Sequence, residues 1–207
     1  MKSTLPTIAL TGGIATGKST CCALLRGLNL GVTVFDADAS VAKWYREKEV
    51  LDQIRLYFGK DVFGEKGEVN KVRLRAWAFA DVDARHFLEE IFHPRVREDC
   101  LALLALEAKN PATRLFVADI PLLFESGFDF GQSVNLLVAT SRKTQIDRVK
   151  KRNGWDDMMV EAVLSSQMPI DAKIKLADIV FWNEGPERML RNQCHRYLQE
   201  LADVQSQ

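Results

Sequence analysis

The sequence predicts an α/β fold built on a five-stranded parallel sheet that is flanked by helices. Short, continuously apolar runs alternate with longer segments of helical periodicity, a pattern typical of strands covered on both faces. A glycine-rich turn follows the first run and leads directly into an amphipathic helix, as expected when a helix connects two parallel strands. The predicted strands are Thr7–Leu10, Val32–Phe35, Leu115–Ala118, Val134–Ala139 and Ile179–Trp182.

Apolar stripes predict the first and the last helix. The first helix is expected over about Lys18–Leu28, because apolar residues repeat there at the spacing i, i+3, i+4, i+7 in Cys21, Leu24, Leu25 and Leu28. The last helix has Pro186 in its first turn, where proline is tolerated. Its apolar stripe consists of Met189, Leu190, Tyr197, Leu198 and Leu201.

The stretch between the second and third strands is too long for a single crossover helix. It is mostly helical over about residues 41–113 and predicts an insert beside the sheet. We expect His93–Pro94 to break a helix there, because the residue before a proline avoids the α region. No internal repeat or low-complexity linker separates the insert from the rest, so residues 1–207 are predicted to form one domain.

Composition and charge exclude several classes of protein. The 207 residues contain 28 Lys and Arg and 28 Asp and Glu, so a general nucleic-acid binder is not expected. Four cysteines (Cys21, Cys22, Cys100 and Cys194) have no metal-ligand spacing and predict a reducing compartment. We expect no signal peptide, because a glycine-rich turn follows within a dozen residues of Met1, and no apolar run reaches the roughly 18 residues of a membrane span. We therefore expect a cytoplasmic protein.

The glycine-rich turn carries the clearest chemical signal. Residues 12–19 fit the pattern G-x-x-x-x-G-K-[ST] of a phosphate-binding P-loop, in the strand–turn–helix context that the motif requires. Glycines let successive N–H groups point inward at phosphate oxygens, and the following helix adds its N-terminal dipole. In this motif Lys18 supplies a positive charge to the β- and γ-phosphates, and the Ser19 hydroxyl ligates Mg²⁺. The motif predicts nucleotide binding.

Three carboxylates follow predicted strands, where ligands of open α/β sheets bind. Asp36 and Asp38 follow the second strand, and Asp119 follows the third. A carboxylate there could accept a hydroxyl proton or hold Mg²⁺ through water. Asp38 could equally be the N-cap of a helix, and Asp119 could be a turn residue before Pro121 rather than a Walker B acid. Spacing does not decide which of the three is the base.

A basic helix is predicted after the fourth strand. Between Arg142 and Arg152 there are six basic residues and one acid, and Asn153–Gly154 ends the helix. Arg148 and Arg152 are four apart and share a face, as exposed arginines of a lid that closes over a transferring phosphate would. The alternative is a solvated helix face. Nucleic-acid binding is disfavoured, because no aromatic residues interleave with the charges.

Several segments, in order along nearly the whole chain, resemble the dephospho-coenzyme A kinase family. Leu10–Thr20 is similar to that family's loop LTGGIGSGKST, and Asp119–Glu125 reads DIPLLFE as the family does. The remaining similar segments are Phe35–Asp38 (DAD), His93–Pro94 (HP), Arg148–Gly154 (lid arginines and RDG), Gln167–Pro169 with Lys173 and Ala177–Asp178 (QMPxxEKxxxAD), and Asn183–Gly185 (NxG). The departures are Ala15, Thr16, Asn153 and Ala172, where the family usually has Gly, Ser, Asp and an acid.

The resemblance implies a P-loop kinase fold with a helical substrate-side insert and a lid over about residues 142–170. It implies that ATP phosphorylates the ribose 3′-hydroxyl of dephospho-CoA, with Mg²⁺ as cofactor, to give CoA and ADP in the last step of coenzyme A biosynthesis. The ATP phosphates and Mg²⁺ would be held by Gly12, Gly13, Ile14, Ala15, Thr16, Gly17, Lys18, Ser19 and Thr20, with Asn183 and Gly185 near adenine.

The resemblance also implies roles on the acceptor side. Asp38 would be the base on the 3′-hydroxyl, and Arg148 and Arg152 would clamp the transferring phosphate. His93, Leu122, Leu123 and Phe124 would line the acceptor site, although three apolar residues after a strand could equally belong to the core. The expected partners are the two substrates, ATP and dephospho-CoA, without nucleic acid or membrane, for a monomer or weak homo-oligomer.

Two other functions remain as alternatives. Another nucleoside or nucleotide monophosphate kinase would share the loop, the lid and the acid. A GTPase switch would need the guanine-reading sequence N-K-x-D, but the only Asn-Lys pair, Asn70-Lys71, is followed by Val72-Arg73.

Overall fold

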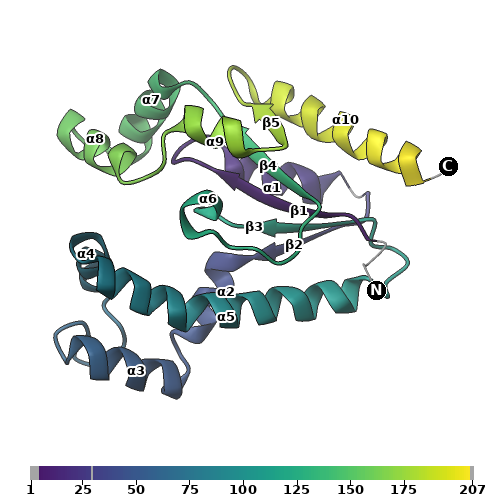
Figure 1. The fold of residues 1–207 in the computed structure, drawn as a ribbon. Helices are drawn as coiled ribbons and strands as arrows, with labels where there is room; N and C mark the ends of the chain where they lie inside the picture. Colours follow the sequence, from purple (N-terminus) through teal and green to yellow (C-terminus); the bar gives the residue numbers. More distant parts are fainter. Residues whose placement is uncertain (1–4, 29, 206–207) are drawn as a thin grey trace. The chain divides into compact units, whose positions relative to one another are not determined.

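All five predicted strands are present in the computed structural model, which describes residues 5–28 and 30–205. They form one parallel sheet in the order β2-β3-β1-β4-β5 (Figure 1). The strands are β1 (Thr7–Gly12), β2 (Val32–Asp36), β3 (Leu115–Asp119), β4 (Val134–Ala139) and β5 (Ile179–Trp182). The α/β fold class is confirmed, and each strand lies within two residues of its predicted bounds.

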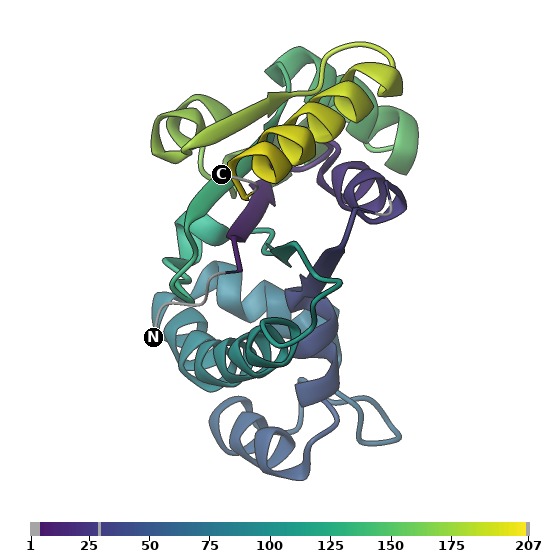
Figure 2. The same ribbon diagram turned by 90° about the vertical axis from the view of Figure 1, so that its right-hand side faces the viewer.

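Continuous apolar runs form these strands because both faces of the sheet are buried. On one face, α1 (Lys18–Gly27) and α10 (Glu187–Gln205) lie side by side (Figures 1 and 2). Leu25 of α1 and Leu190 of α10 pack there with Ile8 and Leu10 of β1. On the other face, Phe116 of β3 contacts Phe130 edge to face, with ring centroids 6.2 Å apart. Burying such a side chain stabilises the fold by about 1.5–3 kcal/mol.

The chain divides into two compact units. Unit 1 contains the sheet and consists of the residues up to Phe35 and from Leu103 onward, and unit 2 is Asp36–Ala102. The predicted insert, about residues 41–113, thus overlaps unit 2 but begins and ends later. The remaining helices are α2 (Ala37–Trp44), α3 (Lys48–Phe58), α4 (Lys71–Ala80), α5 (Val82–Glu107), α6 (Leu123–Ser126), α7 (Arg142–Asn153), α8 (Asp157–Ser165) and α9 (Ile170–Leu176). None of the described helices is long and apolar enough to cross a membrane.

The break predicted at His93–Pro94 is wrong. Helix α5 runs without interruption from Val82 to Glu107 with Pro94 inside it. A proline inside a helix costs about 3 kcal/mol, because it removes one hydrogen bond and crowds the preceding turn. Two features offset this cost: apolar side chains on both sides of the proline are buried, among them Phe92 and Val96, and the Arg95 guanidinium donates to the carbonyl of Ile91 over 2.8 Å.

Candidate active site

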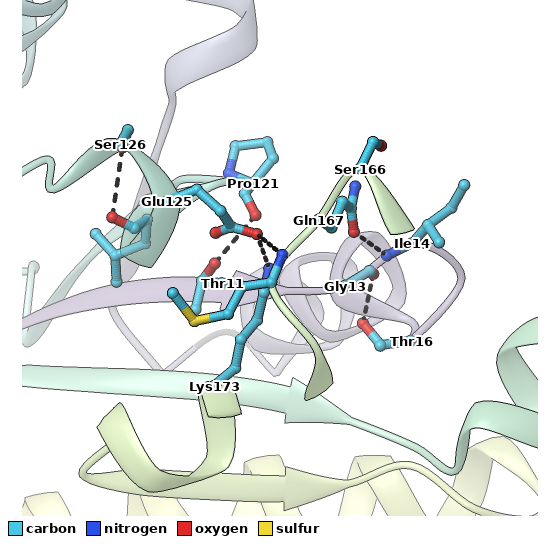
Figure 3. A network of polar contacts seen from close by, with 12 residues as sticks. Thr11, Gly13, Ile14, Thr16, Pro121, Glu125, Ser126, Ser166, Gln167 and Lys173 are labelled. Carbon is cyan, nitrogen blue, oxygen red and sulfur yellow. Dashed lines mark hydrogen bonds and ion pairs between the residues drawn. The ribbon is translucent and has the colours of Figure 1, made fainter. Parts of the chain in front are cut away.

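The P-loop leaves β1 at Gly12 and enters α1 at Lys18, as the motif predicts. Gly17 has a φ of +99°, and a Cβ atom built there would lie 2.1 Å from Nδ2 of Asn183, so only glycine fits. Ala15 has a φ of +58°, a conformation that favours glycine, which is the residue the resembling family has at this position. The Thr16 hydroxyl is buried and donates to the carbonyl of Gly13 over 3.0 Å (Figure 3).

The carbonyl groups of the loop are held from its outer side. Nδ2 of Asn183 donates to the Thr16 carbonyl over 2.8 Å. The guanidinium of Arg148 donates to the carbonyls of Ala15 and Asn183, over 3.2 and 3.0 Å. Because the C=O and N–H of a trans peptide point in opposite directions, the N–H of Gly17 points away from Asn183. These contacts therefore turn part of the loop's N–H array toward the side where phosphate oxygens would lie.

Lys18 and Asp119 form an ion pair where β1 and β3 end. Their side chains are 16% and 14% exposed, so the pair is only partly screened by water. The Cys22 thiol donates to the other carboxylate oxygen of Asp119 over 3.2 Å. Burial, together with the Asp119 charge, raises the pKa of this thiol, which therefore stays protonated and able to donate. The pairing favours the Walker B role of Asp119 over that of a turn residue.

Oxygen donors suited to Mg²⁺ are present at this place. Ser19 is exposed in the first turn of α1, and Asp119 presents a carboxylate at the end of β3. Mg²⁺ prefers such hard oxygen ligands and usually completes its shell with phosphate oxygens and water. In the described part of the chain no three His, Cys, Asp or Glu side chains gather as a metal cluster. Ser19 and Asp119 thus fit the predicted role as magnesium partners.

The acidic pair after β2 has two different positions. The Asp36 carboxylate caps α2, accepting the N–H of Ala39 over 2.9 Å. Asp38 lies two residues later, in the first turn of α2, and is exposed. The alternative that Asp38 is the N-cap is therefore wrong, because Asp36 fills that place.

The residues predicted to line the acceptor site differ in exposure. Leu122 is 43% exposed, Leu123 is 3% exposed and Phe124 is half-buried on α6. Leu123 thus belongs to the interior, as its core alternative predicts, while Leu122 and Phe124 retain accessible surface. His93 is half-buried on α5 of unit 2, and burial lowers the pKa of its imidazole, opposed by Glu89. Their contact with an acceptor remains a prediction.

The basic helix has the predicted bounds, Arg142–Asn153, and ends at Gly154 in the left-handed conformation. Its two arginines are not equivalent. Arg152 is exposed and its Nε donates to Oδ1 of Asn153 over 2.8 Å. Arg148 is half-buried against the P-loop, which corrects the expectation that both are exposed on a lid. The guanidinium has five N–H donors and so can satisfy several backbone carbonyls at once.

Helices α7 and α8 pack on the P-loop through an apolar cluster. Val149, Val160 and Leu164 are its buried members, and Ile14 and Ala15 of the loop pack against them. The two loop positions between Gly13 and Thr16 are therefore apolar because they contact the predicted lid. The sequence predicts only ATP binding for Ile14 and Ala15. An apolar residue such as Ile14 in a glycine-rich turn could also have indicated packing against another element.

A polar network joins the segment after α8 to the loop after β3 (Figure 3). Lys173 of α9 is completely buried and pairs with Glu125 of α6, with Nζ and Oε1 2.7 Å apart. The same oxygen accepts the N–H of Met168 over 3.0 Å. Removing one partner of a buried ion pair costs about 3–5 kcal/mol, so this contact fixes the turn that contains Gln167 and Met168.

Glu184 connects the loop after β5 to the start of α7. Its carboxylate accepts the N–H of Ser141 over 3.0 Å and hydroxyl hydrogens of Thr140, Ser141 and Thr144. The Ser141 N–H and these hydroxyl donors lower the pKa of Glu184 to about 2. The contact positions the neighbouring residues Asn183 and Gly185, which the resemblance places near adenine.

This lowered pKa predicts a specific acid sensitivity. Because the Glu184 pKa lies below its ordinary value of 4.5, its contribution to stability is complete above about pH 4.5 and is lost as the pH falls toward about 2. We expect the free energy of unfolding of the wild type to fall more steeply over this range than that of Glu184→Gln, which cannot titrate. Urea unfolding at several pH values measures the difference, and parallel curves would contradict the prediction.

Comparisons with known proteins agree with the resemblance found in the sequence. A sequence profile of the dephospho-CoA kinase family matches residues 6–188. A dephospho-CoA kinase of Geobacillus kaustophilus is 36% identical over 195 residues, which cover 94% of this chain and 96% of that protein. A dephospho-CoA kinase of Wolinella succinogenes is 38% identical over 205 residues, which cover 97% of each chain.

Solved structures share the fold. The crystal structure of TT1252 from Thermus thermophilus is 34% identical, has a TM-score of 0.79, and aligns over 95% of this chain and 98% of that one. Dephospho-CoA kinase from Campylobacter jejuni is 24% identical with a TM-score of 0.66 over 96% and 98% of the two chains. Shikimate kinase from Acinetobacter baumannii, 17% identical with a TM-score of 0.50 over 98% and 96%, shares the general architecture. With the P-loop, the parallel sheet and the matched profile together, the chain belongs to the dephospho-CoA kinase family and is a kinase of the P-loop class.

Proposed function

We propose that this chain binds Mg²⁺ and ATP at the P-loop of unit 1 and uses Asp38 as the base on the ribose 3′-hydroxyl of dephospho-CoA. The reaction is the one that names its family, phosphorylation of dephospho-CoA to CoA with release of ADP. The observation that carries the proposal is the ion pair of Lys18 and Asp119, which brings the P-loop lysine and a strand-end acid together beside an N–H-rich turn. Phosphoryl transfer needs this combination of cation, acid and backbone donors.

Each residue contributes one part of the mechanism. Lys18 leaves the Asp119 carboxylate for the β- and γ-phosphates and stabilises the charge that develops there. Ser19 and Asp119 would hold Mg²⁺, which when bound neutralises phosphate charge. Asp38 accepts the hydroxyl proton while the oxygen attacks phosphorus, and Arg152 compensates charge on the transferring group. Arg148 holds the loop carbonyls and adds its positive charge beside them.

The two arginines should behave differently when replaced by alanine. Arg152→Ala should lower kcat but leave the melting temperature nearly unchanged, because exposed contacts contribute only about 0–1 kcal/mol. Arg148→Ala should lower both, since its hydrogen bonds to backbone carbonyls are charge-assisted, and one such bond is worth about 1.5–3 kcal/mol. Steady-state kinetics and thermal melts of both variants measure this. If Arg152→Ala turns over normally, Arg152 is only part of a solvated helix face.

The acceptor tests the proposal as a whole. We expect dephospho-CoA to be phosphorylated at the 3′-hydroxyl with a much higher kcat/KM than AMP or adenosine. Unit 2 is larger than a nucleoside requires and carries several arginines, among them Arg75 and Arg97, while Phe124 offers apolar surface to a pantetheine arm. Such remote binding positions the hydroxyl, so truncated acceptors lose kcat as well as affinity.

The decisive measurement is kcat/KM for dephospho-CoA, AMP and adenosine under one set of conditions, with the phosphorylated position identified by NMR. If AMP matches dephospho-CoA, the chain is a monophosphate kinase instead. We further propose a cytoplasmic protein, monomeric or weakly homo-oligomeric, that binds neither nucleic acid nor membrane. Its zero formal net charge supports the absence of a polyanionic partner.

A further inference from the structure

Two glutamines hold the backbone N–H and the backbone C=O of one P-loop residue, Ile14, and so engage the two peptide groups on either side of its Cα. Nε2 of Gln145, on α7, donates to the carbonyl of Ile14 over 2.8 Å. Oε1 of Gln167, in the turn after α8, accepts the N–H of Ile14 over 3.0 Å (Figure 3). The two residues belong to opposite ends of the predicted lid, residues 142–170. One glutamine uses its amide as donor and the other as acceptor, so the polarity of each contact is fixed.

Both glutamines are themselves held in place. Gln145 is only 4% exposed and lies on the first turns of α7, where Ser141 caps the helix by accepting the N–H of Thr144. Gln167 directly precedes Met168, whose N–H is bound by Glu125, and Glu125 in turn pairs with the buried Lys173. The amides therefore approach Ile14 from rigid supports and lose little further rotamer entropy when they bind it.

Gly13 supports the position of the Gln145 amide. A Cβ atom at Gly13 would lie 2.8 Å from Nε2 of Gln145 and 3.8 Å from Oε1 of Gln167. Its φ is not in the left-handed region, so backbone freedom is not the reason for glycine at this position. The close approach of the Gln145 amide is such a reason, whereas Gln167 lies at an ordinary contact distance. A side chain at Gly13 would force the Gln145 amide to shift away from Ile14.

We propose that Gln145 and Gln167 are positioning residues for ATP, which fix the two peptide groups flanking Ile14 and thereby the shape of the phosphate-binding turn. The inference deepens the proposed function and rests on ATP binding at this loop. The Ile14 N–H is already bound by Gln167 and is therefore not one of the donors offered to phosphate. Because the backbone of Ile14 is held in this way, the later N–H groups, around Gly17 to Thr20, form a preorganised array. Little conformational entropy is then lost at the loop when ATP binds.

The same chemical change at both positions should give opposite results. The Gln167→Glu variant keeps a side-chain oxygen that can accept the Ile14 N–H. The Gln145→Glu variant loses the N–H donor and places a carboxylate oxygen against the Ile14 carbonyl oxygen, so this hydrogen bond is lost. Both variants place one negative charge beside the same loop, and the neutral variants Gln145→Met and Gln167→Met separate the effect of charge from the effect of the lost contact. We expect Gln145→Glu to bind a non-hydrolysable ATP analogue at least about tenfold more weakly than Gln167→Glu, since losing one such contact costs about that factor.

Neutral variants separate positioning from folding. Gln145→Met and Gln167→Met should raise KM for ATP more than they lower kcat. Gln132→Met is the matched control, because Gln132 holds one backbone N–H, that of Phe130 over 3.1 Å, at a loop remote in sequence from Ile14. It should leave KM for ATP unchanged. Amide exchange gives a readout without nucleotide: the Ile14 N–H should exchange faster in Gln167→Met than in the wild type or Gln167→Glu.

The outcomes divide as follows. Weaker analogue binding in Gln145→Glu than in Gln167→Glu, with fast Ile14 exchange in Gln167→Met, supports the proposal. Equal affinity of the two glutamate variants overturns it, and so does unchanged Ile14 exchange in a folded Gln167→Met. A wild type that does not bind the analogue at all overturns the proposed function together with this inference, and that result is distinguishable because it requires no variant.

Discussion

Replacing Lys18 with alanine should lower kcat about 10²–10³-fold while the protein remains folded, because a preorganised charge on the transferring phosphate is lost. Lys18 is the first residue of α1 and lies beside Asp119 at the ends of β1 and β3. Its ammonium group acts on oxygens that gain charge in the transition state. Steady-state kinetics with saturating dephospho-CoA and ATP measure the loss, and a thermal melt verifies the fold.

Lys48→Ala is the matched control for this variant. Lys48 is likewise the first residue of a helix, α3, and is exposed in unit 2, so its removal changes net charge equally but leaves the P-loop intact. Lys48→Ala should keep nearly normal turnover. Near-normal turnover of Lys18→Ala would instead mean that the P-loop does not serve as the phosphate site, and the function would have to be assigned anew.

The strands and the P-loop were predictable because their signals are local. Continuous apolar runs such as Leu115–Ala118 are buried on both faces of the sheet, so their pattern alone predicts an interior strand. The loop requires glycine at Gly17, where φ is positive and the Asn183 side chain leaves no space for a Cβ atom, and the motif marks this position without a structure. In both cases the local sequence determines the backbone conformation, and the tertiary structure preserves that local conformation.

The helical unit was harder to predict because tertiary contacts decide its details. Local propensity predicts a break at Pro94, but burial of the side chains around it keeps α5 continuous. By residue type, either Asp36 or Asp38 could be the N-cap of α2. Which of the two caps the helix depends on the residue at which β2 ends and α2 begins. Boundaries of this kind are set by packing rather than by the pattern itself.

Several site contacts carry no sequence signal of their own. Arg148 has a helical spacing that groups it with Arg152, but only the fold brings its guanidinium to the carbonyls of the P-loop. The residue type and position of Gln145 predict nothing specific, since a glutamine on a basic helix is usually solvated. The i, i+4 spacing of Lys18 and Cys22 could have suggested that both face Asp119. Contacts across such distances in sequence need the structure.

Asp38→Asn should reduce kcat by about 10²–10⁴-fold, the usual contribution of a general base, while affinity for ATP stays close to that of the wild type. The amide has nearly the same shape as the carboxylate but cannot accept the hydroxyl proton. Asp38 is exposed in the first turn of α2 and is not the residue that caps this helix. A large change in ATP affinity is therefore not expected, and binding of an ATP analogue measured alongside kcat tests this separation.

Asp36→Asn is the discriminating control, because it makes the same substitution two positions earlier. Asparagine caps a helix about as well as aspartate, so α2 should remain capped and the melting temperature should change little. If Asp38 is the base, Asp36→Asn keeps most of its turnover and Asp38→Asn loses it. If the losses are reversed, Asp36 is the base as well as the cap. If both variants turn over normally, the proton is taken elsewhere, and Asp119→Asn becomes the variant to measure, since Asp119 is the remaining acid at the end of a strand.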